Sequence, residues 1–495
     1  MASTSNHIAC DLGASGGRVV LGSFDGEHLK LELLHRFDNG PLQLAGSLHW
    51  NAPGLLEQVK VGLARCATRS LDLAGIGIDT WGVDFGLLSQ HGQLLGLPYH
   101  YRDARTSGMI EAALKIVPRE EIYARTGIQF MELNTLYQLL ALARFEPRVL
   151  EAADTLLFMP DLLNFWLSGI RQSEHSIAGT SQMFDGARCE WCADLLEALE
   201  LPTRILPKVS APAAVIGPFS AQVANEVGLP SVPVIAPAGH DTACAVAAVP
   251  AQGEDWAYIS LGTWSLIGVE LASPIRTAEA LAASFTNESG IAGTTRFLRN
   301  VVGLWLIQEC RRAWAANGRE ISYEALADMA ADAQPHLCCI DADDPRFAHP
   351  GDIPARIQAC CAETNQPIPQ TEGEIARCVL ESLALKHAVI LAALERIVAR
   401  RIKVIHIVGG GARNRLLCRL TADAAGKPVV AGPAEATAAG NVMIQSLACG
   451  EVSSVAQIRS VIRDSTELER YQPQHGPEWD EARIRFETLF DPIAS

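Results

Sequence analysis

The segment Gly239-His240-Asp241-Thr242 contains the strongest candidate in this sequence for a proton acceptor. It follows the apolar run VPVIAP, which predicts a short buried strand, and precedes the small-residue run ACAVAA, which predicts a helix. A carboxylate at the C-terminal end of a buried strand faces the cleft of an α/β domain, where it can take a proton from an attacking hydroxyl group. Asp241 could equally cap the following helix, and the two roles do not exclude each other.

Two short turns with glycine residues lie between apolar runs, and each can present backbone N–H groups to phosphate. The first is DLGASGGR, residues 11–18, and the second is SLGTWSL, residues 260–266. Glycine lets the backbone approach a ligand closely. Each turn alone is also typical of an ordinary hairpin, but two matched turns facing each other across a cleft could hold the β- and γ-phosphates of a nucleotide.

Side chains add to the chemistry of the first turn. Ser15 and Arg18 could donate to phosphate, and Asp11 could hold a magnesium ion through water. The segment is not a Walker loop, because no Gly-Lys-Ser/Thr follows the glycines.

A third glycine-rich turn, residues 408–414, joins the apolar run VIHIV to a helical pattern. This arrangement exposes a helix N-terminus and lets a flat adenine or ribose lie against the backbone. A Rossmann site is excluded, because G-x-G-x-x-G and its acidic partner are missing. The alternative is a tight strand-to-helix turn without a ligand.

The elements that must position these turns fall into two series. Residues 7–37 predict a β-meander, followed by a helix around 54–68 and strands in LAGIGID and VDFGLLS. Strands start again at 232–263, and one apolar face from Ile375 to Ile397 predicts a long helix that opens with the capping box Thr371-x-x-Glu374. We therefore expect two similar α/β halves, residues 1–250 and 251–495.

Composition excludes several classes of function. The chain has 495 residues, 48% of them hydrophobic, and a formal net charge of −16. An acidic chain is unsuited to unaided binding of nucleic acid or of an anionic membrane. The N-terminus predicts no signal peptide, and every long apolar stretch carries charges, so we expect a globular, cytoplasmic protein.

Thirteen cysteines are scattered along the chain. Cys189 and Cys192 form one C-x-x-C, but no second pair in zinc-ligand spacing follows it. The pattern therefore favours small buried apolar residues in a reducing compartment over a disulfide framework or a zinc site.

Several strings in this order resemble the FGGY carbohydrate kinases over nearly the whole chain. They are DLGASGGR, GIDTWGVDFGLL, YRDART, TGIQF, NTLYQL, GHDTA, GTWSL, NVVGLWLIQE, HIVGGGARN and AGPAEAT. The resemblance implies an α/β protein with the two-domain actin-like ATPase (ribonuclease H-like) fold, in which mixed sheets carry helices on both faces. It places the active site in the cleft between the domains.

The resemblance also implies roles for individual residues. Asp241 matches the catalytic proton acceptor, and ATP with Mg²⁺ is the implied phosphoryl donor, with Asp11 as the metal contact through water. The positions that match ATP contacts are Ala14, Ser15, Gly16, Gly17, Arg18, Thr263, Gln308 and Gly410. Those that match sugar contacts are Gly82, His240, Asp241, Thr242 and Asn300.

Within the family, the strings imply conversion of L-rhamnulose to L-rhamnulose 1-phosphate. The Arg-Glu pair of glycerol kinases is replaced by Gly82-Val83, and the Met-His-Gly of xylulokinases by Thr80-Trp81-Gly82. An apolar wall at Trp81 would favour the methyl group of a deoxysugar, although a lone Trp is more often part of a core.

Other functions remain open from the sequence alone. The alternatives are a kinase for another ketose such as L-fuculose or ribulose, and an actin-like ATPase that uses the nucleotide as a conformational switch. A sugar-dependent regulator is disfavoured, because neither a helix-turn-helix nor a basic DNA-binding face is evident. We expect a monomer or a small homo-oligomer with no nucleic-acid or membrane partner.

Overall fold

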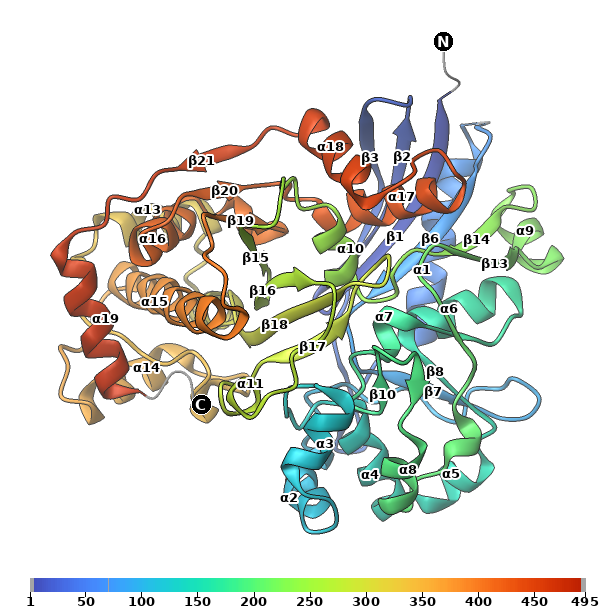
Figure 1. Ribbon diagram of the computed structural model, residues 1–495, viewed down its shortest axis with the longest axis horizontal. Helices are drawn as coiled ribbons and strands as arrows, with labels where there is room; N and C mark the ends of the chain where they lie inside the picture. The colour runs from blue at the N-terminus through green and yellow to red at the C-terminus, as the bar shows by residue number, and fades with distance from the viewer. Residues whose placement is uncertain (1–3, 70, 491–495) are drawn as a thin grey trace.

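Apolar runs separated by tight turns form the first sheet of the computed structural model, which describes residues 4–69 and 71–490 (Figure 1). The predicted meander is confirmed: β1 (Ser5–Gly13), β2 (Gly16–Phe24) and β3 (Leu29–Asp38) are antiparallel neighbours. Strands β6 (Gly75–Thr80) and β14 (Pro233–Ala236) extend the sheet in parallel with β1, and β13 (Ala214–Pro218) closes its edge antiparallel to β14. The resulting order is β13-β14-β6-β1-β2-β3.

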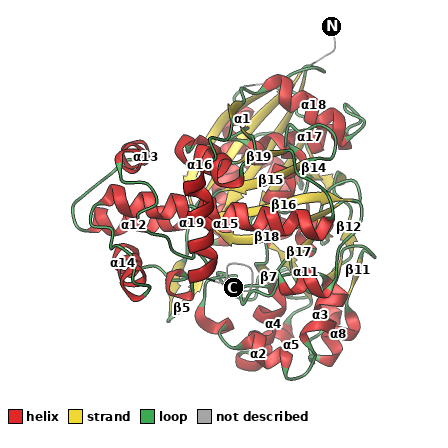
Figure 2. Cartoon of the chain, turned by 60° about the vertical axis from the view of Figure 1, so that its left-hand side comes forward, coloured by secondary structure: helices red, strands yellow, loops and turns green. Residues whose placement is uncertain are grey.

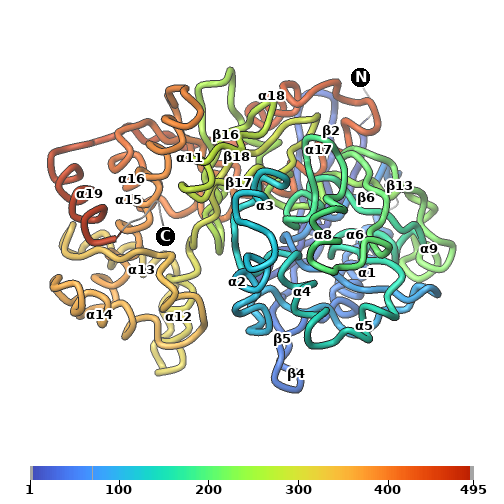
Figure 3. The backbone as a smooth tube through the Cα atoms, turned by 60° about the horizontal axis from the view of Figure 1, so that its bottom comes forward, coloured from blue at the N-terminus to red at the C-terminus, as the bar shows by residue number. Residues whose placement is uncertain are grey.

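The second sheet repeats this order with later segments of the chain. Strands β15 (Trp256–Leu261), β16 (Trp264–Leu271) and β18 (Thr295–Val302) are antiparallel neighbours, with β17 (Thr286–Ser289) beyond them. On the other side of β15 lie the parallel strands β19 (Val404–Val408) and β20 (Val429–Ala431), then the antiparallel β21 (Glu469–Tyr471). The prediction of two similar α/β halves is thus confirmed, and we call them the N-terminal and C-terminal halves (Figure 3).

Helices and short strands complete both halves. In the N-terminal half they are β4 (Leu42–Leu44), β5 (Ser47–His49), α1 (Ala52–Ala67), β7 (Phe85–Leu88), α2 (Met109–Leu114), α3 (Arg119–Thr126), α4 (Thr135–Phe145), α5 (Pro147–Ala152), β8 (Thr155–Phe158), α6 (Met159–Ser168), β9 (Ser173–Glu174), α7 (His175–Ala178), β10 (Phe184–Asp185), β11 (Glu190–Trp191), α8 (Ala193–Ala198), β12 (Val209–Ser210), α9 (Ala221–Val227) and α10 (Asp241–Ala247). In the C-terminal half they are α11 (Ala278–Ala282), α12 (Trp305–Ala316), α13 (Tyr323–Asp332), α14 (Ile353–Glu363), α15 (Glu372–Val398), α16 (Arg415–Ala425), α17 (Ala436–Ala448), α18 (Val455–Ser465) and α19 (Pro477–Leu489).

The long helix α15 is the centre of the C-terminal half. Both hydrogen bonds of the predicted capping box between Thr371 and Glu374 are present at its start, which confirms that prediction. Most of its residues are buried, because α13, α16 and α19 pack around it (Figure 2). Among the described residues, no helix combines the length and the apolar character that a membrane span requires.

Helix α17 connects the two halves. It comes late in the chain but packs on β1 and β6 of the first sheet, and in Figures 1 and 3 it lies beside the blue N-terminal strands. Glycines make the fit possible: a Cβ on Gly22 would lie 2.6 Å from Val442, and one on Gly77 would lie 2.6 Å from Asn441. The division at residue 250/251 stays a prediction.

The crossing of α10 and α17 is the tightest of these contacts. We expect Gly440→Ala to destabilise the protein by about 1–3 kcal/mol, the range for overpacking a well-packed contact. Its Cβ would lie 1.9 Å from the Cys244 carbonyl oxygen, so the two helices would have to separate. Urea denaturation followed by circular dichroism measures the loss.

The matched control for this prediction is Gly40→Ala. No heavy atom lies within 4 Å of a Cβ at that position, so stability should change by less than about 0.5 kcal/mol. Unchanged stability of Gly440→Ala would contradict the close crossing.

Candidate active site

A cavity of about 1240 Å³ lies between the two halves and is lined by residues of both. Two of the residues matched by the family resemblance do not reach it: Gly16 and Gly17 lie in β2, and a Cβ on Gly17 would collide with the Phe37 ring. The other predicted site residues all line it, namely Asp11, Ala14, Ser15, Gly82, Arg18, His240, Asp241, Thr242, Thr263, Asn300, Gln308 and Gly410.

The first turn is shorter than the predicted segment, residues 11–18. Only Ala14 and Ser15 connect β1 to β2, because Asp11 and Arg18 face each other as a cross-strand pair. The Arg18 guanidinium donates to Asp11 Oδ2 from Nε at 2.8 Å and from Nη2 at 2.6 Å, and it also contacts Glu435 of the C-terminal half. Arg18 therefore holds two carboxylates in place at the wall of the cavity, and its contact with ATP stays a prediction, while Asp11 Oδ1 is not used by this pair.

A second carboxyl group, Asp79 at the end of β6, lies fully buried beside Asp11. Its Oδ2 accepts a 2.6 Å hydrogen bond from Asn441 of α17, whereas Oδ1 has no partner. Burial raises the pKa of Asp79 well above its ordinary value, and the carboxylates of Asp11 and Asp241 raise it further. A magnesium ion prefers carboxylate oxygens and water, and of these two carboxyl groups only Asp11 lines the cavity, so Asp11 fits the predicted contact with such a cation.

Asp241 is the third carboxyl group near this site. A capping role would require α10 to begin at Thr242, but the helix begins at Asp241 itself. His240 occupies the N-cap position, so the prediction that Asp241 caps the helix is wrong. The Asp241 side chain is 27% exposed and can be reached from the cavity. Burial raises the pKa of the Asp241 carboxyl group and the nearby Asp11 raises it further, although His240 opposes this effect.

A chain of charged and polar groups fixes His240. Its Nε2 lies 3.4 Å from Asp241 Oδ1, and Arg296 Nη2 lies 3.1 Å from its Nδ1. Arg296 is fully buried and pairs with Glu288 at 3.1 Å. Burial opposes ionisation of Glu288, but Arg296 and His240 together lower the pKa of its carboxyl group to about 2. Glu288 also accepts a 3.2 Å hydrogen bond from Asn300, so one network reaches two predicted sugar contacts.

The backbone before Asp241 is held from the N-terminal half. Glu174, the N-cap of α7, accepts a 2.7 Å hydrogen bond from the Gly239 N–H group. Ser176 Oγ in turn accepts one from the His240 N–H group at 3.2 Å. These bonds fix the end of the strand-to-helix connection that carries the candidate base.

One wall of the cavity is apolar and strained. Trp81 donates from Nε1 to the buried Asp84 at 2.9 Å, and Val83 beside it has φ of 68°. A β-branched residue in the left-handed region is a marked outlier, and such strain clusters at functional sites. Thr180 and Thr135 hold Val83 through hydrogen bonds to its N–H and C=O groups at 3.2 and 2.7 Å.

The third glycine turn packs against the second. A Cβ on Gly411 would lie 2.3 Å from Leu261 Cγ, and Gly409 has φ of 84°, so side chains are excluded at both positions. Gly410 differs, because a Cβ there meets no heavy atom within 4 Å and would stand in the cavity. The turn therefore offers bare backbone to a ligand.

Arg102 crosses from the N-terminal to the C-terminal half. Its guanidinium lies over the rings of Trp264 and Trp305, at 5.3 and 4.3 Å from their centroids. It also donates a 2.7 Å hydrogen bond to the Ala348 carbonyl oxygen. Trp264 follows Thr263 directly, so this contact links the second turn to the N-terminal half.

Sequence reasoning missed the pair Glu288 and Arg296 and the bond between Asn441 and Asp79. The first pair depends on the register of β17 and β18, which no local pattern reveals. The second joins residues 362 positions apart.

Two family models match this chain, and together they cover most of it. The N-terminal domain of the FGGY family of carbohydrate kinases matches residues 7–248, and its C-terminal domain matches residues 257–449. The chain belongs to the FGGY family of carbohydrate kinases. The cavity lies between the parts of this kinase that the two models match.

Individual relatives agree with this assignment. The kinase is 45% identical to a rhamnulokinase of Bacteroides thetaiotaomicron, over 97% of this chain and 98% of the relative. It is 38% identical to a rhamnulokinase of Bacillus subtilis, over 94% and 95% of the two chains.

Solved structures share the fold at low sequence identity. A xylulose kinase of Lactobacillus acidophilus superposes with a TM-score of 0.77 at 17% identity, over 98% of this chain and 97% of that one. A Plasmodium falciparum glycerol kinase with ADP superposes with a TM-score of 0.79 at 13% identity, over 100% and 99% of the chains. The expected two-domain FGGY fold is thereby confirmed.

Two glycines allow the ends of the cavity to be tested separately. We expect Gly410→Val to raise KM for ATP by about tenfold or more and to leave KM for the sugar nearly unchanged, because its side chain enters open space beside the third turn. Steady-state kinetics with each substrate varied in turn measures both constants.

Gly82→Ala is the matched variant at the other end. Its Cβ would lie 3.3 Å from Thr180 Cγ2, so the disturbance falls beside Val83 and should raise KM for the sugar instead. The same changes of KM in both variants would contradict the prediction that Gly410 contacts ATP and Gly82 contacts the sugar.

Proposed function

We propose that this kinase transfers the terminal phosphoryl group of ATP to O1 of L-rhamnulose. The observation that carries the proposal is the match at 38–45% identity to rhamnulokinases over nearly the whole chain, combined with Asp241 at the wall of the shared cavity. Membership of the FGGY family supports the reaction class, and the similarity to rhamnulokinases supports L-rhamnulose as the ketose.

The sugar end of the cavity suits a deoxyketose. Asn300, His240 and Glu288 offer donors and acceptors to hydroxyl groups, and Trp81 with Val83 provides an apolar surface. A site that hydrogen-bonds hydroxyl groups rejects analogues lacking them more strongly than an apolar wall selects a methyl group. The strained backbone of Val83 keeps this wall in one position.

Asp241 acts as the general base in the proposed mechanism. Its carboxylate accepts the proton of the attacking 1-hydroxyl group as the oxygen approaches phosphorus. His240, fixed by Arg296 and Glu288, lies against the same carboxylate and orients it. The proton leaves the sugar oxygen and remains on Asp241 until it passes to water.

The phosphate end relies on backbone groups. The turns at Ala14–Ser15 and Thr263 offer N–H groups from opposite sides of the cavity, which suits an acidic protein that lacks a basic surface. Magnesium, when bound with ATP, would supply positive charge to the phosphate oxygens, and Asp11 is the residue that would hold it, through water. Gln308 and Gly410 lie at the nucleotide end of the same cavity.

Ketose preference tests the substrate directly. We expect the highest kcat/KM with L-rhamnulose in a panel that also contains L-fuculose, L-ribulose, D-xylulose and glycerol. The apolar wall favours a methyl group by about 1–3 kcal/mol over the last three, which lack one. The expected preference over L-fuculose, which also carries a methyl group, rests on the similarity to rhamnulokinases. A coupled assay of ADP release measures the panel. A tenfold preference for another ketose would refute the substrate and leave the kinase assignment intact.

The role of Asp241 is tested by Asp241→Asn, which preserves the size of the side chain. We expect kcat to fall by about 10²–10⁴-fold or more, because the base is lost, while folding and ATP binding persist. Turnover with saturating L-rhamnulose, and nucleotide binding by calorimetry, measure the two effects. Near wild-type turnover by a folded Asp241→Asn protein would contradict the assignment.

The pH profile is the control for this variant. Because the pKa of Asp241 is raised, its carboxylate takes up a proton at a higher pH than an exposed aspartate does. The kcat of the wild type should therefore fall as the pH drops through that raised pKa. The residual activity of Asp241→Asn should lack this acid limb.

A further inference from the structure

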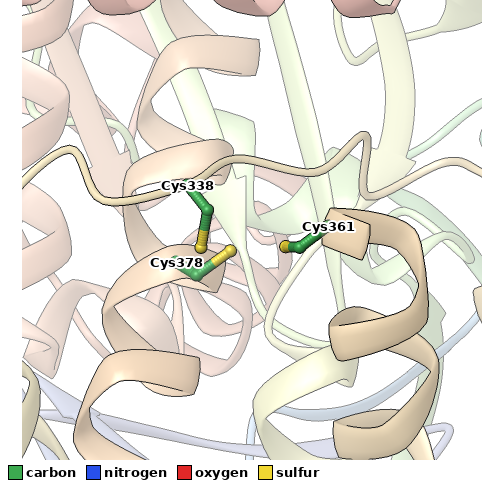
Figure 4. A group of neighbouring side chains, drawn as sticks. All are labelled: Cys338, Cys361 and Cys378. Atoms are coloured by element: carbon green, nitrogen blue, oxygen red, sulfur yellow. The ribbon is translucent and has the colours of Figure 1, made fainter. Parts of the chain in front are cut away.

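Three cysteine side chains from separate segments meet inside the C-terminal half (Figure 4). Cys338 lies in the connection after α13, Cys361 in α14 and Cys378 in α15. Their sulfur atoms all lie within 4.8 Å of one another, and Figure 4 shows the side chains pointing toward one another. We call these residues the cysteine trio.

The trio is sealed from solvent. Cys338, Cys361 and Cys378 are 1%, 0% and 2% exposed. The neighbouring Cys339 differs, because its thiol is engaged with Gln366 Oε1 at 3.4 Å. The trio thiols instead lie close to one another.

We propose that the cysteine trio binds one thiophilic cation with a filled d shell, Zn²⁺ or Cu⁺. Thiolate ligands select these ions over magnesium and calcium, and three sulfur atoms already face a common point. Zn–S bonds of about 2.3 Å place sulfur atoms about 3.8–4.0 Å apart, so the trio needs a contraction of less than about 1 Å. No oxidant is required, because each ligating thiol only releases its proton to water.

The second group of potential ligands in the described residues is a weaker candidate. His7, Cys449 and Glu451 also lie within 4.8 Å of one another, but His7 Nε2 is already paired with Glu451 at 3.0 Å and Cys449 is exposed. His7 is fully buried and already has Glu451 as its partner, so this group leaves no common free point for a cation. Cys449 is therefore useful as a control.

A cation in the trio would fasten three segments around the long helix. It would tie the connection after α13, the helix α14 and the first turns of α15 to one point. Helix α13 lines the nucleotide side of the cavity through Tyr323, Glu324, Ala327 and Asp328. The cation would therefore stabilise the wall that carries α13 without touching the reacting atoms.

Metal content of the full-length protein tests the proposal. The protein is produced under reducing conditions in medium supplemented with zinc in one arm and copper in the other, then analysed by elemental mass spectrometry. We expect about one equivalent of metal in one arm, as a single site requires. Cys338→Ser, Cys361→Ser and Cys378→Ser should each retain at least about tenfold less metal, because each removes one of three ligands.

Matched variants and the wild type itself keep the test decisive. Cys360→Ser, one residue from Cys361 and equally buried, and Cys449→Ser should both keep the metal. If the trio variants do not fold, wild type refolded with the metal must unfold at a higher temperature than wild type refolded with chelator. Wild type without metal in both arms, metal retained in the trio variants, or an intact mass that shows a disulfide within the trio would overturn the proposal.

Discussion

Three buried or half-buried carboxyl groups, Asp11, Asp79 and Asp241, lie close together: burial and the other two carboxylates raise the pKa of Asp79, and burial and Asp11 raise that of Asp241. Groups from both halves compensate this repulsion. Arg18 neutralises Asp11 from within the first hairpin, and Asn441 reaches across from α17 to Asp79. Like charges in a poorly hydrated place destabilise a fold unless cations or donors face them.

In the proposed function, the two ends of the cavity recognise phosphate and sugar by different kinds of groups. The proposed phosphate contacts are backbone groups of two-residue turns, and bare backbone is also exposed at Gly410 in the third turn. The proposed sugar contacts are side chains, and neighbours hold this part of the wall: threonine hydroxyl groups hold Val83, and a buried guanidinium holds His240. Rigid polar groups lose little entropy when a substrate binds, which favours specificity.

Much of the fold could be read from the sequence because its signals are local. Apolar runs, glycine turns and the capping box at Thr371 each depend on residues a few positions apart, and the repeated strand series revealed two halves. The cavity residues followed from motif resemblance. Contacts between distant segments could not be predicted: Glu288 pairs with Arg296 through the register of two strands, and Asn441 donates to Asp79 across 362 positions of the chain.

Helix α17 is synthesised long after the sheet on which it packs. The first sheet is synthesised early, but the helix that covers one of its faces leaves the ribosome only after most of the C-terminal half. Until then Asp79 lacks Asn441, the Ile8 carbonyl lacks Gln445, and the surface shaped by Gly22 and Gly77 faces water. The face of the first sheet that α17 covers therefore gains this packing partner only after most of the C-terminal half has been synthesised.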